Sequence, residues 1–161
     1  MQSIVVRFEK AAHGTLALRF TLEGQISQVH VPPPQPARFV DGLWRRTCCE
    51  IFIAPKGSTL YREFNFSPSG EWAAYEFQRY REGGALADSA LDPRIAVRRG
   101  EERLELEACV SYPAQVSSVA LCAVIEDRAG VLYYWALKHP PGKPDFHHPL
   151  GFALELDEVR D

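Results

Sequence analysis

The chain has 161 residues, 46% of them hydrophobic, and carries a formal net charge of −3 at pH 7. This length suits one domain with one core, the hydrophobic share excludes a disordered chain, and the charge argues against a general nucleic-acid binder, which needs a basic face. The N-terminal residues lack the basic start and apolar run of a signal peptide, and no apolar stretch reaches the roughly 20 residues that cross a bilayer. We therefore expect residues 1–161 to form a single cytoplasmic domain that contacts neither membrane nor nucleic acid.

Alternating apolar and polar residues run through the chain and predict strands with one buried face. In residues 15–22 the leucines and Phe20 share a face, and in residues 104–110 the apolar residues alternate with two glutamates. Turn-forming residues at 55–58 and 67–70 separate neighbouring runs and predict hairpins. Residues 79–91 are expected to form a short helical turn or an irregular crossover. Nine strands are predicted, over residues 3–8, 15–22, 48–54, 61–66, 71–77, 104–110, 119–126, 131–137 and 151–156.

Many short strands without long helices predict an all-β fold, namely an antiparallel two-sheet β-sandwich of jelly-roll or immunoglobulin-like type with long loops. Two proline-rich stretches, residues 31–46 and 138–151, interrupt the strands. Because proline cannot donate to a β-ladder, we expect both to be stiff extended loops. The second stretch contains three of the five histidines, and long ordered loops are frequent places for function.

A first set of candidate binding residues lies on the middle strands. Alternation places Tyr61, Glu63 and Asn65 on one face, opposite Phe64 and Phe66, which are expected in the core. Aromatic, carboxyl, amide and guanidinium groups on one face suit a polar ring-shaped ligand, whereas the alternative is a solvated face with cross-strand ion pairs. The predicted ligand-binding residues are Trp44, Arg46, Glu50, Tyr61, Glu63, Asn65 and Trp72.

The 138–151 stretch and the aromatic run before it form a second set. It either closes over a pocket at one end of the sandwich or is a loop pinned to the sandwich by its aromatic residues. His139, Asp145 and the adjacent His147 and His148 offer metal ligands, but neighbouring histidines seldom bind one ion and the spacing matches no strong metal motif. We therefore predict no metal and no cofactor. The set comprises Tyr133, Tyr134, Trp135, Lys138, His139, Asp145, His147 and His148.

Reactive groups form no recognised catalytic motif: GxSxG, P-loop, GxGxxG and HExxH patterns do not occur. Glu50 and Glu63, on neighbouring strands, could form the acid pair of a glycosidase, but two glutamates on a sheet face more often pair with arginine. We therefore predict that the protein is not an enzyme. The cysteines lack CxxC spacing and lie in apolar surroundings, so we expect free buried thiols at Cys48, Cys49, Cys109 and Cys122.

Three segments resemble a known family. LWRRTCCEIFIAP and YREFNFSPSGEWAAYEF resemble the DOMON-like domains, which are related to the family 9 carbohydrate-binding modules, and ALCAVIEDRAGVLYYWALKHPPGKPDFHHPLGFALEL resembles a stand-alone bacterial subgroup. The resemblance implies a β-sandwich that binds haem or sugars and has no catalytic residues. Sugar-binding relatives hold a terminal sugar between two aromatic side chains. Trp44 and Glu50 match the motif that runs into the ligand face, and Tyr61, Asn65 and Trp72 follow on neighbouring strands.

The sequence also departs from the pattern of these relatives. Acidic residues that commonly flank the glutamate are replaced here, since Thr47 and Cys48 precede Glu50 and an Ala-Pro pair follows the strand. Haem-binding relatives use methionine and histidine as axial ligands, and the only methionine here is Met1. Haem would therefore need two histidines as ligands, drawn from His30, His139, His147 and His148.

Taken together, these patterns predict a non-catalytic binding module for a polar small molecule, a saccharide or a sugar-derived metabolite. Trp44 and Trp72 would stack on the ligand, the carboxyl and amide groups would form hydrogen bonds, and Arg46 would add a charge-assisted bond. Two alternatives stay open. One is a protein-interaction module that uses the 138–151 stretch and exposed sheet edges. The other is a metal-dependent enzyme built on His139, His147 and His148.

Overall fold

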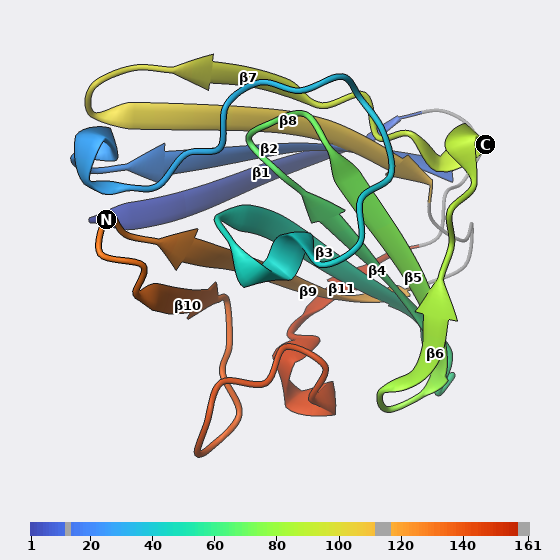
Figure 1. Cartoon of the computed structure of the whole chain (residues 1–161). Helices are drawn as coiled ribbons and strands as arrows, with labels where there is room; N and C mark the ends of the chain where they lie inside the picture. The colour runs from blue at the N-terminus through green and yellow to red at the C-terminus, as the bar shows by residue number, and fades with distance from the viewer. Residues whose placement is uncertain (12–13, 112–116, 158–161) are drawn as a thin grey trace.

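Two antiparallel β-sheets pack face to face in the computed structural model, which describes residues 1–11, 14–111 and 117–157 (Figure 1). The smaller sheet has the strand order β1-β2-β8-β7. The larger sheet has the order β10-β9-β3-β4-β5-β6, and β11 also pairs with β9. The predicted all-β, two-sheet sandwich is thus confirmed.

The nine predicted strands are all present, and the described residues contain two more, β6 and β7. Residues 79–91 hold β6 and the short 3₁₀ helix η4 (Ser89–Leu91) rather than a helical turn or crossover alone. The other 3₁₀ helices are η2 (Ile26–Gln28), η3 (Leu43–Arg45) and η5 (Pro149–Gly151). The strands are β1 (Ser3–Ala11), β2 (Thr15–Glu23), β3 (Cys48–Pro55), β4 (Tyr61–Phe66), β5 (Trp72–Arg79), β6 (Glu82–Ala85), β7 (Ala96–Arg99), β8 (Arg103–Ser111), β9 (Ser117–Glu126), β10 (Leu132–Ala136) and β11 (Leu154–Leu156).

The main core lies between the two sheets and follows from alternation. Every second residue of β2 and β8, including Phe20 and Leu106, points inward and is fully buried. These side chains meet those of the larger sheet, including Ile51, Phe64 and Phe66. Each large apolar side chain buried in this way contributes about 1.5–3 kcal/mol, so the alternating pattern supplies the main attraction between the sheets.

The larger sheet is buried on its outer face as well. Phe52, Tyr61, Ala120 and Cys122 form a second buried cluster there, packed against side chains that include Phe146. The cover is the segment between β10 and β11, hereafter the 137–153 loop, which lies on the side of the larger sheet away from the smaller sheet (Figure 1). This second layer encloses polar side chains that a solvated sheet face would leave in water.

The 31–46 stretch runs as the expected extended loop beside the start of β5. Its backbone forms two hydrogen bonds with that of Trp72. Val40 N donates to Trp72 O (2.8 Å), and Trp72 N donates to Arg38 O (3.1 Å). The stretch ends in η3, which carries Trp44 to the outer face of the larger sheet.

Candidate functional site

A pocket of about 390 Å³ opens on the outer face of the larger sheet, between the middle strands and the 137–153 loop. We call it the Glu50–Glu63 pocket after the two carboxyl groups that it contains. Its walls combine rings from the sheet, η3 and the loop with a small number of charged groups. The lining residues are Trp44, Glu50, Phe52, Glu63, Tyr75, Phe77, Arg81, Val124, Tyr134, Pro144, Asp145, Phe146 and His147.

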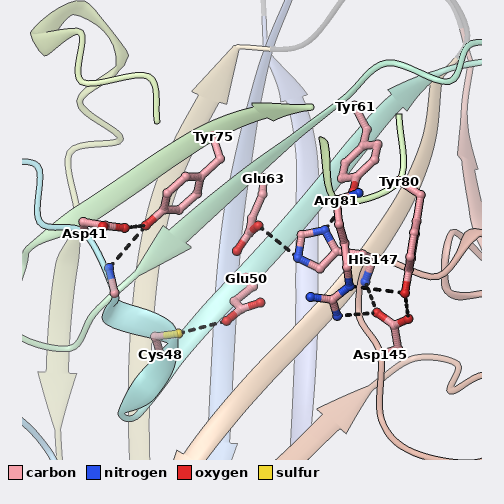
Figure 2. Close-up of polar contacts among 11 residues, drawn as sticks. Asp41, Cys48, Glu50, Tyr61, Glu63, Tyr75, Tyr80, Arg81, Asp145 and His147 are labelled. Carbon is pink, nitrogen blue, oxygen red and sulfur yellow. Dashed lines mark hydrogen bonds and ion pairs between the residues drawn. The ribbon is translucent and has the colours of Figure 1, made fainter. Parts of the chain in front are cut away.

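Register brings Glu50 and Glu63 together. Glu50 of β3 lies opposite Asn65 of β4, and Glu63 lies opposite Phe52, so the two glutamates are diagonal neighbours on one face. Both are buried, at 2% and 5% exposed, and their carboxyl groups point into the same space (Figure 2). The Cys48 thiol donates a hydrogen bond to Glu50 Oε1 (3.2 Å).

Burial controls the charge of this pair. Desolvation raises the pKa of Glu63 to about 7, against smaller opposing effects of the Asn65 amide and the Arg81 charge. Desolvation, and then repulsion from Glu63, raise the pKa of Glu50 well above its usual value. At neutral pH the pair therefore retains a proton and presents both a donor and an acceptor to the pocket.

His147 is held beside Glu63 by a chain of hydrogen bonds (Figure 2). Its Nδ1 lies 2.8 Å from the hydroxyl of Tyr61, and its Nε2 lies 3.5 Å from Glu63 Oε2. The Tyr61 oxygen accepts from the Arg81 backbone N–H (3.0 Å), and we assign the Tyr61 hydroxyl as the donor to His147 Nδ1. The single N–H of the neutral ring is then on Nε2 and faces Glu63. Desolvation, followed by the charge of Arg81, lowers the pKa of His147 to about 4, so the ring is neutral at pH 7.

An ion pair joins the β5–β6 turn to the 137–153 loop across the mouth of the pocket. Arg81 donates to Asp145 Oδ1 (2.8 Å), and the Tyr80 hydroxyl donates to Asp145 Oδ2. Burial by itself would raise the pKa of Asp145, but these two hydrogen bonds outweigh it and lower the pKa. Asp145 also accepts from the His147 backbone N–H (3.1 Å) and so fixes the loop where it enters the pocket.

The rim of the pocket carries an exposed aromatic ring. Trp44 in η3 is 45% exposed, and the Arg45 guanidinium lies 4.9 Å from its ring centroid. Tyr75 of β5 holds the preceding turn, because its hydroxyl donates to Asp41 Oδ1 (2.5 Å) and accepts from Gly42 N (3.3 Å). Trp44 is therefore placed at the opening by the chain on either side, with Arg45 over its ring and nearly half of its surface exposed.

Three of the seven residues predicted to bind ligand, Trp44, Glu50 and Glu63, line the pocket directly. Tyr61 lies on the same sheet face but acts through His147 rather than as part of the wall. Asn65 also shares this face and is fully buried, and its amide lowers the pKa of the neighbouring Glu63. The expected parity of the middle strands is therefore correct.

The other two predicted residues are elsewhere, and these placements correct the prediction. Trp72 is 3% exposed and packs edge-on against Phe39 in the core between the sheets, because it pairs with Phe66 and shares its inward face. Arg46 forms an ion pair with Glu126 (2.7 Å) and is absent from the lining of the pocket. Neither side chain is placed to contact a ligand in the Glu50–Glu63 pocket.

Two further kinds of residue complete the site. Some were predicted as part of the second set, and others were not predicted at all. Tyr134, Asp145 and His147 belong to the second predicted set, and the fold brings them over the first. Phe77 follows Tyr75 at a spacing of two, which is a signal that could have found it. Arg81 gives no such signal, because only the hairpin between β5 and β6 carries it to the pocket.

The histidines of the 137–153 loop have other contacts in this fold. His148 Nδ1 accepts from Leu150 N (3.1 Å), and the ring of His139 lies against that of Phe146. Within residues 1–11, 14–111 and 117–157, no three His, Cys, Asp or Glu side chains gather in a way that could hold a metal ion.

The four cysteines are free, but their burial differs from the prediction at one position. Cys48, Cys49 and Cys122 are buried, whereas Cys109 is exposed because it lies on the outward-facing side of β8. Burial raises the pKa of all three buried thiols, which keeps them protonated. No helix in the described part of the chain is long and apolar enough to span a membrane.

No family model and no curated protein matches the sequence. Among solved structures, the fold is similar to the crystal structure of a candidate carbohydrate-binding protein from Bacteroides uniformis. The TM-score is 0.62, and the match covers 92% of this chain and 76% of that chain at 15% sequence identity. At this identity the likeness shows a shared fold alone.

Proposed function

We propose that this chain is a non-catalytic binding module that takes a saccharide or a sugar-derived metabolite into the Glu50–Glu63 pocket. One observation carries the proposal: buried hydrogen-bonding groups and accessible aromatic rings face the same cavity. Its volume of about 390 Å³ is in the range of small-molecule sites. The similarity in fold to the Bacteroides protein supports a binding role.

A sugar has apolar ring faces and a rim of hydroxyl groups, and the pocket offers a complement to each. Trp44 presents an accessible ring at the opening, where stacking on a sugar face excludes water. Glu50 and Glu63 retain a proton between them and can therefore both donate to and accept from hydroxyl groups. We further propose that the chain is a DOMON-like domain, in which case Trp44 and Glu50 correspond to positions of the sugar-binding relatives.

Calorimetric titration with mono- and disaccharides tests this function. Trp44→Ala and Glu50→Gln are expected to weaken saccharide binding by about tenfold or more, because each removes a contact of roughly 1.4 kcal/mol or more. Tyr133→Ala is the matched control for Trp44, since Tyr133 is comparably exposed but does not line the pocket. If saccharides bind and both pocket variants bind them as the wild type does, the site is wrong.

Glycoside hydrolysis is a second candidate function, favoured by the two carboxyl groups with raised pKa in one pocket. A glutamate with a pKa of about 7 is suited to proton transfer at neutral pH. Release of 4-nitrophenol from a panel of 4-nitrophenyl glycosides, abolished by Glu63→Gln, would establish it. Binding of the same sugars without any release would leave the binding role alone.

The protein-interaction alternative stays a prediction. The 137–153 loop already has an intramolecular role, because Phe146 and Phe152 pack on the larger sheet and Asp145 pairs with Arg81. A partner that bound this loop would therefore have to use its remaining exposed side chains, such as Leu137 and Leu150.

A further inference from the structure

The Glu50–Glu63 pocket contains more acidic than basic groups. Its lining includes the carboxyl groups of Glu50, Glu63 and Asp145, and one guanidinium, that of Arg81. Arg81 is already paired with Asp145 at 2.8 Å. In the described part of the chain, neither Glu50 nor Glu63 forms an ion pair with an arginine or lysine, and Glu63 faces the neutral ring of His147 at 3.5 Å.

Two buried carboxyl groups side by side are costly to ionise unless a cation balances them. The sheet keeps them together nonetheless, since register places both on the same face of β3 and β4. The protein itself balances them by retaining a proton. A ligand that brings its own positive charge can replace that proton and form charge-assisted hydrogen bonds with both oxygens.

The surrounding rings favour the same kind of ligand. Trp44, Tyr75, Phe77, Tyr134 and Phe146 line the pocket around the carboxyl groups. The face of an aromatic ring attracts a cation through its quadrupole, and this attraction is stronger where water is excluded. A neutral sugar gains stacking from these rings and hydrogen bonds from the carboxyl groups, but no attraction between opposite charges.

We propose that the ligand of the Glu50–Glu63 pocket carries an ammonium group, as amino sugars do, and that Glu50 and Glu63 receive this group between the aromatic walls. This inference rests on the proposed function and names the chemical class of its ligand. It is supported by the pKa of Glu63, which at about 7 leaves this carboxyl group close to ionisation at neutral pH. Charge-assisted hydrogen bonds from an arriving ammonium group therefore favour the ionised form of Glu63, whose proton passes to water.

Matched sugars that differ only at carbon 2 test the inference. We would titrate the protein with glucosamine, glucose and N-acetylglucosamine, and with the β-1,4-linked disaccharide of each. The amino sugars are expected to bind about tenfold tighter than their hydroxyl and acetamido counterparts, because a charge-assisted hydrogen bond exceeds a neutral one by roughly that factor. Raising the salt concentration should reduce the difference only weakly, since the carboxyl groups are buried.

Two variants test whether the preference for amino sugars comes from the pocket carboxyl groups, and a third variant is the control. Glu50→Gln and Glu63→Gln preserve shape but remove charge, and each should bring the ratio of amino-sugar to neutral-sugar affinity close to one. Glu105→Gln removes a carboxyl group from β8 in the other sheet and should leave the ratio unchanged. Thermal unfolding of each variant confirms that it is folded.

The outcomes separate the inference from the proposed function. A preference for amino sugars that disappears in both pocket variants supports the inference. Equal affinity for all three sugars at this pocket, or a preference that survives Glu50→Gln and Glu63→Gln, overturns the inference and leaves the saccharide-binding function standing. No binding of any of these six sugars overturns the inference, and the wider saccharide panel then decides the proposed function separately.

Discussion

At the scale of single residues, the two tryptophans at the ends of the predicted site have opposite roles. Trp72 is packed in the core between the sheets, whereas Trp44 is at the pocket rim with 45% of its surface exposed. Their sequence contexts do not separate them, because each has one apolar and one charged neighbour, Arg45 after Trp44 and Glu71 before Trp72. The pairing of Phe66 with Trp72 places Trp72 in the core, since cross-strand partners point to the same face of a sheet.

This difference predicts opposite effects of alanine at the two positions. Trp72→Ala should lower the free energy of unfolding by about 3–5 kcal/mol, because it leaves a large cavity in the core. Trp44→Ala should change it by less than about 0.5 kcal/mol, because the side chain is on the surface. Urea unfolding at constant pH measures both. Comparable losses of stability in the two variants would contradict the placement of Trp72.

At the scale of elements, β6 shows how a breaker residue can belong to a strand. In the sequence, Gly83 and Gly84 argue against a long helix, and in the structure Gly83 pairs with Phe77 at the point where the register of β5 and β6 shifts. A Cβ atom on Gly83 would overlap the carbonyl oxygen of Glu76, whereas a Cβ atom on Gly84 would meet nothing within 4 Å. Glycine at position 83 is therefore required by close approach of the two backbones.

Alanine at these neighbouring glycines makes a matched pair. Gly83→Ala should destabilise the protein by about 1–3 kcal/mol, since the backbone of β6 must move away from β5. It should also weaken ligand binding, because Arg81 sits in the turn between these strands. Gly84→Ala should change neither quantity appreciably. Thermal unfolding and calorimetric titration of both variants test this, and an equal response of the two would refute the close approach.

The 137–153 loop is a second element whose role depends on a few anchors. Asp145→Asn weakens its attachment to Arg81 and Tyr80, both of which lie outside the loop. We expect a loss of global stability below about 1 kcal/mol, because Arg81 is more than half exposed. Hydrogen exchange at the backbone amides of residues 145–148 should nevertheless become faster. Unchanged exchange there would mean that the aromatic contacts alone hold the loop.

At the scale of the whole molecule, buried titratable groups with opposite shifts determine how stability depends on pH. The pKa of Glu63 rises from 4.5 to about 7, so in this range the folded protein holds a proton that the unfolded chain has lost, and stability falls as pH increases. The pKa of His147 falls from 6.5 to about 4, so in that range stability increases with pH. Between about pH 4.5 and 6.5 the two contributions oppose each other, and above that range only the carboxyl contribution continues.

Removing one of the two groups should leave the other to determine how stability depends on pH. The free energy of unfolding should fall less between pH 5 and pH 8 in Glu63→Gln than in the wild type. We expect the difference between the two falls to be about 2–3 kcal/mol. Urea unfolding at these two pH values measures the gain. The control is Glu105→Gln, which removes a carboxyl group from β8 in the other sheet. A difference between Glu63→Gln and wild type that is the same at both pH values would contradict the raised pKa.

The sequence by itself determined nine of the strands, the two-sheet sandwich and the face of the middle strands that carries Tyr61, Glu63 and Asn65. Alternation is a local property, so it can be read along one strand without knowledge of its neighbours. Tertiary structure alone decided that this face is covered, that Trp72 turns into the core, and that His147, Asp145 and Arg81 join the glutamates. These contacts connect residues far apart in the chain, and their positions follow from strand register and loop packing, which no local pattern specifies.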